Sequence, residues 1–491
     1  MSKVNWWKRA SIGFLIFATA AIILPAQTAP TTAPAAPTFT LLHSFNYADG
    51  LGPEELVQGT DGNLYGTTGG GGANNSCDFG CGTVFTITPG GTLTTLHSFD
   101  YTDGDQPVAL ILAIDGNFYG VTNYGGANIC IGGGCGTVFR VTPGGTLTTL
   151  HSFDGPDGFY PSAGLVQATD GNFYGMTVQG GANSCVASGC GTVFTITPGG
   201  QLTTLHIFDS TDGLYPYGGL VQGTDGNLYG TTSGGGADES GTVFRIAPGG
   251  TLTTLYSFCS QTDCPDGTSP QAGLVQGTDG NFYGTTGYGG IKNSYCRAGC
   301  GTIFRITPDG VLTTLHRFGG TDGNFPLAAL ILATDGNFYG TTSQGDPNDG
   351  GTVFRITPSG MLTTLHSFVY YGMEGAFPSA RLVQDTNGKF YGTTPDGGID
   401  GDGTVFSLSV GLGPFVETLP AFGKGGTPIH ILGTNLTGTT NVTFNGTPAT
   451  FTVVSKTLIL TNVPAGATTG KVQVVTTNVT LSSNVPFQVL P

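Results

Sequence analysis

The sequence repeats one unit seven times, and this repetition restricts the fold more than any other feature. Two segments mark each unit: DGN(L/F)YG, which becomes NGKFYG in the last unit, and GT(V/I)F. The first segment begins at residues 61, 115, 170, 225, 279, 335 and 387, and the second begins at residues 82, 136, 191, 241, 301, 351 and 403. A period of roughly 50 to 60 residues indicates a supersecondary element that buries its apolar face against the next copy. The chain is therefore predicted to be a tandem-repeat protein.

Each complete unit contains four short segments rich in β-branched and aromatic residues: LVQGTDG, NLYGTT, GTVFRITPGG and TLTTLHSF. Asp-Gly-Asn separates the first two segments and Pro-Gly-Gly separates the last two, and both sequences favour tight turns. Four antiparallel strands at this period predict one blade of a β-propeller. A small residue recurs in the first strand, and we expect it to lie where the blades crowd around a common axis. In successive units this residue is Gly59, Ala113, Ala168, Gly223, Gly277 and Ala333.

The two ends of the repeat region complement each other. Residues 38–45 read TFTLLHSF, which matches the last segment of a unit, but no other part of a unit precedes them. The seventh unit ends at residue 410 with GTVFSLSV and lacks that last segment. We therefore expect residues 38–45 to supply the outer strand of the seventh blade, which would close the ring and remove its open edge. The predicted fold of residues 38–410 is all-β, a seven-bladed β-propeller closed by an N-terminal strand.

Residues 1–26 have the composition of a signal peptide. Lys3, Lys8 and Arg9 precede the apolar run SIGFLIFATAAIIL, and PAQTA then offers small residues for cleavage. The run is shorter than the roughly 20 residues that a membrane span needs, although an uncleaved anchor is an alternative. A Pro/Thr/Ala-rich linker follows at residues 27–37. We predict a secreted, periplasmic or cell-surface bacterial protein with no membrane span in the mature chain.

Export would place the ten cysteines in an oxidising compartment. They occur as five local pairs, and a repeat that lacks one member of a pair lacks both. Zinc sites have a different ligand spacing and usually include histidine. We therefore predict five disulfides, each within one loop: Cys77–Cys81, Cys130–Cys135, Cys185–Cys190, Cys259–Cys264 and Cys296–Cys300.

The complete unit, LVQGTDGNLYGTT…GTVFRITPGGTLTTLHSF, resembles the GloVer tandem repeat of bacterial "choice-of-anchor" surface proteins. The resemblance covers residues 38–410. It implies a secreted or surface-exposed location and no assigned activity. Members of that family typically end in a sorting anchor, whereas this chain ends without an apolar tail or a basic terminus.

Residues 411–491 differ from the repeats because they carry almost no charge. The segments NVTFNGTPATFTVV and NVPAGATTGKVQVV resemble an IPT/TIG domain, and this resemblance implies an immunoglobulin-like β-sandwich. Short alternating strands separated by frequent turns support a sandwich independently. The predicted order is therefore propeller first and sandwich second.

Six of the seven histidines occupy one position of the repeat, and Tyr256 takes that position in the remaining unit. A residue that is copied in every unit serves the unit, so we interpret these histidines as structural hydrogen-bonding groups. The aspartate of DGN is interpreted as a turn former. The sequence contains no recognisable Ser/His/Asp order, metal-spaced histidine set or phosphate-binding loop. The six histidines are His43, His97, His151, His206, His316 and His366.

The loops between the second and third strands and the loops between blades are expected to share one face of the propeller. These loops hold the tyrosines that lie outside the repeat positions, and they hold most of the acidic residues. Tyrosine supplies rigid amphipathic contact area, and aspartate accepts hydrogen bonds from hydroxyls or cations. The alternative is that these residues only form solvated turns. The candidate ligand-binding residues are Tyr101, Tyr160, Tyr215, Tyr217, Tyr370, Tyr371, Asp103, Asp157 and Asp212.

These patterns favour a secreted or cell-surface binding or adhesion protein, monomeric, with a carbohydrate or an extracellular protein as its ligand. Such an acidic face would repel phosphates, which argues against nucleic acid as a partner. Two alternatives remain open: an extracellular propeller enzyme, a lyase or glycoside hydrolase acting on polysaccharide, and a purely structural envelope protein. No catalytic residue, metal ligand or cofactor is assigned. FDYTDGD at residues 99–105 is a calcium candidate, but its spacing matches no known calcium loop.

Overall fold

The computed structural model describes residues 36–490, apart from residues 75, 132, 182–188, 295, 346 and 347. The predicted signal peptide at residues 1–26 and most of the predicted linker at residues 27–37 lie outside the described residues. The described residues form β-strands, turns and loops. Among them, no helix has the length and apolar character needed to cross a bilayer. The protein is all-β, as the sequence predicts.

Each repeat forms one four-stranded antiparallel sheet, in which sequence neighbours are hydrogen-bonded neighbours. We number these sheets along the chain. Their strands are β2 (Leu51–Gln58), β3 (Leu64–Gly70), β4 (Thr83–Ile87) and β5 (Leu93–Ser98) in sheet 1; β6 (Asp105–Leu112), β7 (Phe118–Tyr124), β10 (Thr137–Val141) and β11 (Leu147–Ser152) in sheet 2; β12 (Val166–Gln167), β13 (Phe173–Thr177), β14 (Thr192–Ile196) and β15 (Leu202–Ile207) in sheet 3; β16 (Val221–Gln222), β17 (Leu228–Thr232), β18 (Thr242–Ile246) and β19 (Leu252–Ser257) in sheet 4; β20 (Val275–Gln276), β21 (Phe282–Thr286), β22 (Thr302–Ile306) and β23 (Leu312–Arg317) in sheet 5; β24 (Ile331–Leu332), β25 (Phe338–Thr342), β26 (Asp349–Ile356) and β27 (Leu362–Val369) in sheet 6; and β28 (Val383–Gln384), β29 (Phe390–Thr394) and β30 (Thr404–Ser409) in sheet 7. β8 (Ile129–Cys130) and β9 (Gly133–Gly134) form a small hairpin in a loop of sheet 2.

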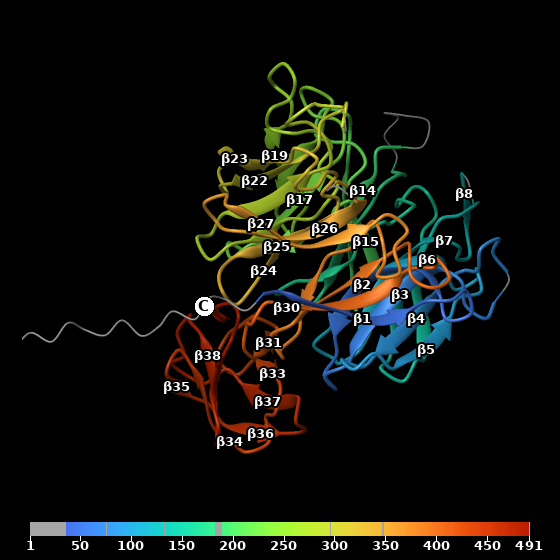
Figure 1. Ribbon diagram of the computed structural model, residues 1–491. Coiled ribbons are helices and arrows are strands. Elements are labelled where there is room, and N and C mark those ends of the chain that lie inside the picture. The colour runs from blue at the N-terminus through green and yellow to red at the C-terminus, as the bar shows by residue number, and fades with distance from the viewer. Residues whose placement is uncertain are drawn as a thin grey trace, which may run out of the picture. The chain divides into compact units, whose positions relative to one another are not determined.

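The fourth strand of sheet 7 comes from the other end of the repeat region. β1 (Thr38–Ser44) pairs antiparallel with β30, and the register runs from Thr38 opposite Ser409 to Ser44 opposite Thr404. Figure 1 shows the two strands together, β1 in blue and β30 in orange. The pairing predicted for residues 38–45 is therefore present, and it covers the hydrogen-bonding edge of β30 that sheet 7 would otherwise expose.

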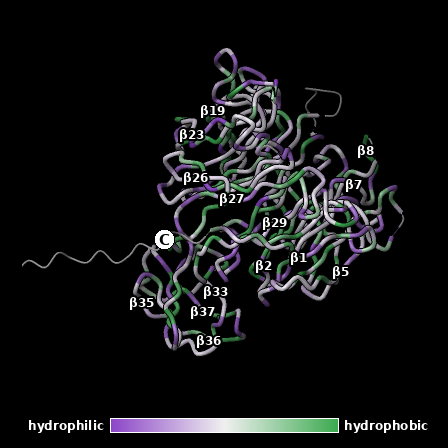
Figure 2. The backbone as a smooth tube through the Cα atoms, viewed as in Figure 1, coloured by the Kyte–Doolittle hydropathy of each residue, from purple (hydrophilic) through white to green (hydrophobic). Residues whose placement is uncertain are grey.

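Buried phenylalanine pairs join each sheet to the next. The phenylalanine after the last strand of one sheet meets the phenylalanine of GT(V/I)F in the following sheet, edge to face, with ring centroids 5.2–5.5 Å apart. Figure 2 shows hydrophobic residues along strands such as β29 and hydrophilic residues in many loops. The seven pairs are Phe45–Phe85, Phe99–Phe139, Phe153–Phe194, Phe208–Phe244, Phe258–Phe304, Phe318–Phe354 and Phe368–Phe406.

A glutamine side chain also bridges five of the junctions near the DGN turns. Gln222, for example, accepts a hydrogen bond from the backbone N–H of Thr169 in the preceding sheet, at 2.9 Å. Gln58 of sheet 1 makes the same contact with Thr386 of sheet 7, accepting from its N–H at 3.0 Å and donating to its hydroxyl at 2.8 Å. Sheet 7 therefore contacts sheet 1 in the way that other neighbouring sheets contact each other.

A tyrosine ring lies against the small residue of the first strand. A Cβ atom on Gly59 would lie 2.5 Å from the ring of Tyr65, and one on Gly277 would lie 2.7 Å from the ring of Tyr283. In both cases the tyrosine belongs to the second strand of the same sheet. Glycine or alanine fits there because the tyrosine ring covers the turn. A Cβ atom on Gly223 would also lie 3.1 Å from the ring of Phe282 in the next sheet, and crowding of the blades around a common axis stays a prediction.

Residues 411–490 form two further sheets around one apolar core. One sheet contains β31 (Glu417–Leu419), β33 (Pro428–Leu432), β37 (Leu458–Asn462) and β36 (Phe451–Val453); the other contains β35 (Thr447–Pro448), β34 (Thr439–Phe444), β38 (Val472–Thr476) and β39 (Thr480–Ser482). β32 (Phe422–Gly423) pairs in parallel with β40 (Gln488–Val489). Ile429, Ile431, Val442 and Val474 are among the buried side chains between the sheets. The IPT/TIG assignment of this region stays a prediction.

This C-terminal region contacts the DGN turns of the repeats. The Thr457 hydroxyl donates to the carbonyl of Thr60 at 2.9 Å, and the Gln488 amide donates to the carbonyl of Thr224 at 2.6 Å. Leu419, of β31, packs in one apolar cluster with Leu112 of sheet 2. Sheet 2 has Leu112 where most repeats have the bridging glutamine, so an apolar side chain replaces a polar one where the C-terminal region packs.

Candidate functional site

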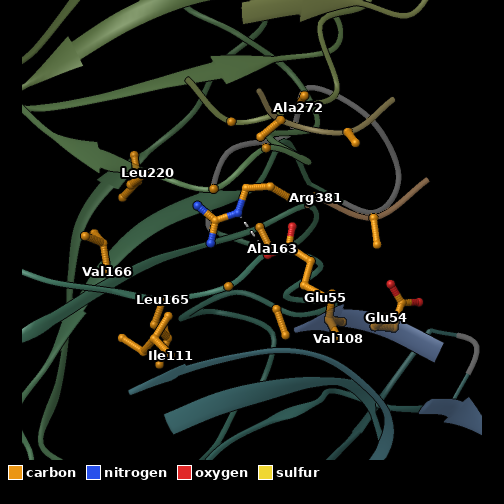
Figure 3. A pocket seen from close by; sticks show the side chains of 18 of the residues that line it. Glu54, Glu55, Val108, Ile111, Ala163, Leu165, Val166, Leu220, Ala272 and Arg381 are labelled. Carbon is orange, nitrogen blue, oxygen red and sulfur yellow. Dashed lines mark ion pairs between the residues drawn. The ribbon is translucent and has the colours of Figure 1, made fainter. Parts of the chain in front are cut away.

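A cavity of about 480 Å³ is lined by the first strands, or the segments just before them, of all seven repeat sheets. Most of its wall is apolar and small. The residue before the leucine of the first strand is alanine or glycine in sheets 2 to 6, but it is Glu55 in sheet 1 and Arg381 in sheet 7. Figure 3 shows these two charged side chains among aliphatic ones such as Ala163, Leu165 and Leu220. The charge in this cavity is therefore concentrated where sheet 7 meets sheet 1.

Arg381 lies between carboxylates from two regions of the chain. Its Nε atom is 3.6 Å from Oε2 of Glu55, an ion pair that the water of the cavity screens. Burial raises the pKa of Glu417, in β31, to about 7, although the positive charge of Arg381 opposes that shift. Arg381 thus helps to balance two acidic groups at once.

Glu54 has no such counter-ion. Burial, and next the neighbouring charge of Glu55, raise the pKa of Glu54 to about 8. Its carboxylate has no hydrogen-bond or ion-pair partner among the described residues. Residues 54 and 55 lie in a β-bulge, where β2 shifts register against β3 between Pro53 and Leu56, and the bulge lets both adjacent glutamates line the cavity. The carboxyl group of Glu54 is surrounded by protein but meets the water of the cavity.

Glu54 also lines a second cavity of about 740 Å³, which is formed by loops of sheets 1 and 2. Tyr101, Tyr124 and Asp105 contribute to its wall, together with the loop closed by the Cys77–Cys81 disulfide. Burial raises the pKa of Asp105 to about 6. The Tyr101 hydroxyl accepts a hydrogen bond from the backbone N–H of Gly134 at 2.7 Å, which fixes that ring. Glu54 therefore stands where the two cavities meet.

Tyrosines gather beside Glu54. The rings of Tyr124 and Tyr160 have centroids 5.1 Å apart. Burial raises the pKa of Tyr160 to about 12, and smaller contributions come from Tyr124, Tyr217 and Glu54. Tyr217 lines the first cavity and Tyr124 the second, so one aromatic cluster spans both. We call Tyr124, Tyr160, Tyr217 and Glu54 the neck cluster.

The backbone holds Tyr160 rigidly. Its φ is 59°, its N–H donates to the carbonyl of Cys135 at 3.1 Å, and its carbonyl accepts from Val178 at 3.0 Å. Every repeat has a residue with positive φ before the equivalent proline, including Tyr215 at 55°. The conformation therefore belongs to the repeat and not to the site, and it presents the neck cluster on a fixed frame.

A family model described as the Gloeobacter/Verrucomicrobia repeat matches residues 30–185, 75–296 and 262–453. These segments overlap and together cover most of the chain. The chain belongs to this repeat family. The matches extend past the seventh repeat into the first part of the C-terminal region.

Solved structures also resemble this member of the Gloeobacter/Verrucomicrobia repeat family. A putative gluconolactonase is 12% identical over 78% of this chain and 94% of that chain, with a TM-score of 0.40. A fungal alcohol oxidase in complex with copper is 12% identical over 92% of this chain and 99% of that chain, with a TM-score of 0.48. The extracellular domain of a putative hybrid two-component system from B. thetaiotaomicron is 12% identical over 93% of this chain and 58% of that chain, with a TM-score of 0.48. No curated protein matches the chain.

The structure brings together some of the predicted tyrosines. Tyr160 and Tyr217 belong to the neck cluster, Tyr215 adjoins Tyr217, and Tyr101 lines the second cavity. Tyr370 and Tyr371 lie elsewhere: their rings pack on each other at 4.4 Å, and neither lines one of these two cavities. The predicted set is therefore divided between the cavities and an exposed loop.

The predicted aspartates are engaged with the repeat histidines. Asp103 accepts from His97 at 2.7 Å, Asp157 pairs with His151 at 2.6 Å, and Asp212 pairs with His206 at 2.8 Å. The Tyr256 hydroxyl makes the equivalent bond to Asp266 at 2.8 Å. His43 and His316 make the same contact with Asp49 and Asp322, so five of the six histidines are structural hydrogen-bonding groups as predicted, whereas Nε2 of His366 lies 3.3 Å from Glu374 without a hydrogen bond. The contacts leave the three aspartates fewer free acceptor atoms for a ligand.

The calcium candidate at residues 99–105 forms a turn in the structure. Asp100 accepts hydrogen bonds from the N–H and the hydroxyl of Thr102, and Asp103 accepts from the N–H of Asp100. Asp105, the third acid, lies within 4.8 Å of the Cys77 and Cys81 sulfurs. Those sulfurs are bonded to each other, so they are not the thiolates that a metal ion would need.

Four of the predicted disulfides are present among the described residues: Cys77–Cys81, Cys130–Cys135, Cys259–Cys264 and Cys296–Cys300. The fifth predicted pair, Cys185–Cys190, includes Cys185, which lies outside the described residues. Cys77 and Gly133, which belong to the loops that hold the disulfides of sheets 1 and 2, both line the second cavity.

Sequence reasoning missed Glu54, Glu55 and Arg381. A signal was available, because these charges occupy positions that hold glycine, alanine or valine in most other repeats. Glu54 and Glu55 lie in a strand and Arg381 just before one, whereas the candidate residues were sought in loops. Tyr124 and Asp105 were recognised only as members of the variable loops.

Proposed function

We propose that the repeat region is a closed seven-bladed β-propeller, and that residues 411–490 follow it as an immunoglobulin-like sandwich. Support comes from the edge-to-face phenylalanine pairs at seven junctions, including Phe45–Phe85 between sheet 7 and sheet 1. The contacts between Gln58 and Thr386 support the same closure. The first cavity would then be the central channel, because each sheet contributes its first strand or the segment before it.

We infer that this Gloeobacter/Verrucomicrobia repeat protein is exported and binds carbohydrate at the neck cluster. The carrying observation is that Glu54, which has no partner among the described residues, lines both cavities, with Tyr217 in the wall of the first and Tyr124 in the wall of the second. Tyrosine rings pack on sugar rings and their hydroxyls exchange hydrogen bonds, and carboxylates accept from sugar hydroxyls. The second cavity has the size of a small-molecule site. The disulfides fit an oxidising compartment.

The test begins with a glycan array and continues with calorimetry on the best oligosaccharide. We expect the double variant Tyr160→Ala/Tyr217→Ala to bind at least roughly thirtyfold more weakly, because truncating buried aromatic anchors typically costs about 2 kcal/mol or more. The double variant Tyr370→Ala/Tyr371→Ala is the matched control, since it removes two tyrosines outside both cavities. Equal losses in the two variants, or a loss only in the control, would contradict the assignment of the site.

Polysaccharide cleavage is a second candidate, and one observation favours it. With a pKa of about 8, Glu54 is largely protonated at neutral pH, as a general acid must be. Incubating the bound oligosaccharides with the protein and measuring new reducing ends or unsaturated products tests this candidate. Product formation that disappears in Glu54→Gln would establish an enzyme; undegraded oligosaccharide would leave binding alone.

A further inference from the structure

Glu54 is the acidic group of the neck cluster. It is largely protonated at neutral pH, because no cation that would favour its ionised form lies beside it among the described residues. Glu55 has Arg381 at 3.6 Å, whereas the Glu54 carboxylate meets no cation among the described residues. A buried carboxylate without a partner is costly, and a ligand that supplies a cation removes that cost. The unsatisfied group here faces two cavities, so a ligand can reach it.

The charged residues in the wall of the second cavity are all acidic. Its described lining includes Glu54, Asp78 and Asp105 and contains no lysine, arginine or histidine. Arg381 lines only the first cavity. Acidic groups in a recess of low dielectric focus a negative potential, which attracts cations and repels anionic ligands. An acidic sugar is therefore disfavoured at this position.

The aromatic groups fit a cation as well. Tyr217 lines the first cavity and Tyr124 the second, each together with Glu54, and the ring of Tyr160 is tilted by 45° against that of Tyr124 with centroids 5.1 Å apart. The face of a tyrosine ring attracts an ammonium group, and the attraction strengthens when water is excluded. Carboxylate and tyrosine faces together form a recess for one positively charged nitrogen.

Other polar side chains in the wall of the second cavity can form hydrogen bonds with hydroxyl groups. Tyr101, Asp105 and Gln106 line the second cavity and carry hydrogen-bonding side chains. A flexible alkylammonium chain would satisfy Glu54 and leave most of the roughly 740 Å³ without polar contacts. A pyranose with a free amine would satisfy both parts, because one substituent is cationic and the others are hydroxyls.

We propose that the ligand of this site is an amino sugar with a free, protonated amine, whose ammonium group pairs with the Glu54 carboxylate beside Tyr160. This proposal rests on the proposed carbohydrate-binding function and names its substrate class. The amine does not react; it donates hydrogen bonds to Glu54 and remains protonated. Acetylation of the amine removes both the charge and the fit.

The experiment compares a glucosamine tetramer with an N-acetylglucosamine tetramer by calorimetry, on the full exported chain. We expect wild-type protein to bind the free amine at least about tenfold more tightly, as a charge-assisted hydrogen bond in a recess implies. Glu54→Gln should abolish this preference, so that the two tetramers bind the variant with similar affinity. Glu239→Gln is the control, since it removes the same charge from an exposed loop of sheet 4.

Each outcome decides a different point. Equal binding of both tetramers to wild type would overturn the amino-sugar proposal and leave carbohydrate binding standing. A loss of preference in Glu239→Gln as large as in Glu54→Gln would also overturn it, because the effect would then come from net charge. A trilysine peptide that binds while both tetramers and the glycan array fail would overturn both proposals and make the partner a basic protein segment. Thermal melting of Glu54→Gln confirms that the variant is folded.

Discussion

Acidic residues stand at both the DGN-turn ends and the loop ends of the repeat sheets, but their hydrogen bonding differs. At the turn ends of sheets 1 to 6, each aspartate accepts hydrogen bonds from an asparagine N–H, an asparagine amide and a tyrosine hydroxyl. Asp225 is typical, with contacts of 3.1, 2.7 and 2.8 Å to Asn227 N, Asn227 Nδ2 and Tyr229 Oη. At the loop end, Glu54 has no such partner. The proposed ligand site thus lies where the repeated pattern leaves an acceptor without a partner.

The pKa values of the acids at the two ends are shifted in opposite directions. At the turn ends the hydrogen bonds from Asn227 and Tyr229 outweigh burial and lower the pKa of Asp225. At the neck cluster, burial and Glu55 raise the pKa of Glu54. The hydrogen bonds of the turn favour the charged form of Asp225, whereas the surroundings of Glu54 favour its protonated form. Stability and binding should therefore respond to different substitutions.

The largest effect is expected from removing β1, which belongs to neither end. Deleting residues 38–45 exposes the edge of β30 and removes Phe39 and Phe45 from the contacts of sheets 6, 7 and 1. We expect loss of the cooperative thermal transition at the wild-type temperature, together with aggregation on gel filtration. A deletion of residues 27–35 is the control. A β1-deleted protein that melts like wild type and stays monomeric would show that β1 is dispensable.

A smaller effect is expected from a single turn substitution. Asp225→Ala removes the acceptor of three hydrogen bonds and should lower the free energy of unfolding by about 1–2 kcal/mol. Oligosaccharide affinity of the folded variant should stay unchanged, because the turn lies at the other end of its sheet. Denaturant unfolding and calorimetry measure the two quantities. Asp238→Ala, on an exposed loop, is the control and should change stability little. Weakened binding by folded Asp225→Ala would put the site at the wrong end.

The smallest effect is a difference in pH dependence between the two ends. Because the pKa of Glu54 is raised to about 8, the unfolded chain releases that proton at lower pH, and stability falls as pH rises from about 4.5 to 8. The lowered pKa of Asp225 contributes stability above about pH 4 that is lost on acidification. We expect the melting temperature to peak near pH 5.

Two variants separate these contributions. Glu54→Gln should flatten the fall on the alkaline side, and Asp225→Asn should flatten the fall on the acidic side. Glu55 and Tyr160, which interact with Glu54, are unchanged in both variants. Melting curves from pH 2.5 to 8.5 test both. An alkaline fall of wild-type size in Glu54→Gln would assign it to other groups, of which Glu417 is the first to examine.

The sequence contained enough information to predict the strands and the missing partner of β30, because both follow from counting repeated segments. It also identified Tyr160 and Tyr217, since tyrosines outside the repeat positions are visible by comparison of units. It did not reveal that Tyr124 lies against Tyr160, because the end of β7 meets the segment that leads into sheet 3 and no local pattern records the contact. It also did not reveal that the ring of Tyr65, from the adjacent strand, lies against Gly59.

Glu54 could have been found by aligning the repeats, but its consequence could not. A glutamate in a strand is ordinary until a bulge turns it toward a cavity, and the bulge depends on how β2 pairs with β3. Likewise, the separation of Tyr370 and Tyr371 from the cavities depends on the path of one loop. Residue types were readable from the sequence, whereas the grouping of those residues required the structure.

The pairing of β1 with β30 has a consequence for the timing of folding. β1 is among the first strands of the chain to be synthesised, and its partner, residues 404–409, is among the last of the repeat region. Folding during synthesis or secretion would build the sheets in order from the N-terminus, each on the one before it, while β1 waits without its partner. A chain that ends within the seventh repeat would thus keep β1 as an unpaired, aggregation-prone strand. Only a chain that has been made through residue 409 can complete sheet 7, so this sheet forms only after the whole repeat region has been synthesised.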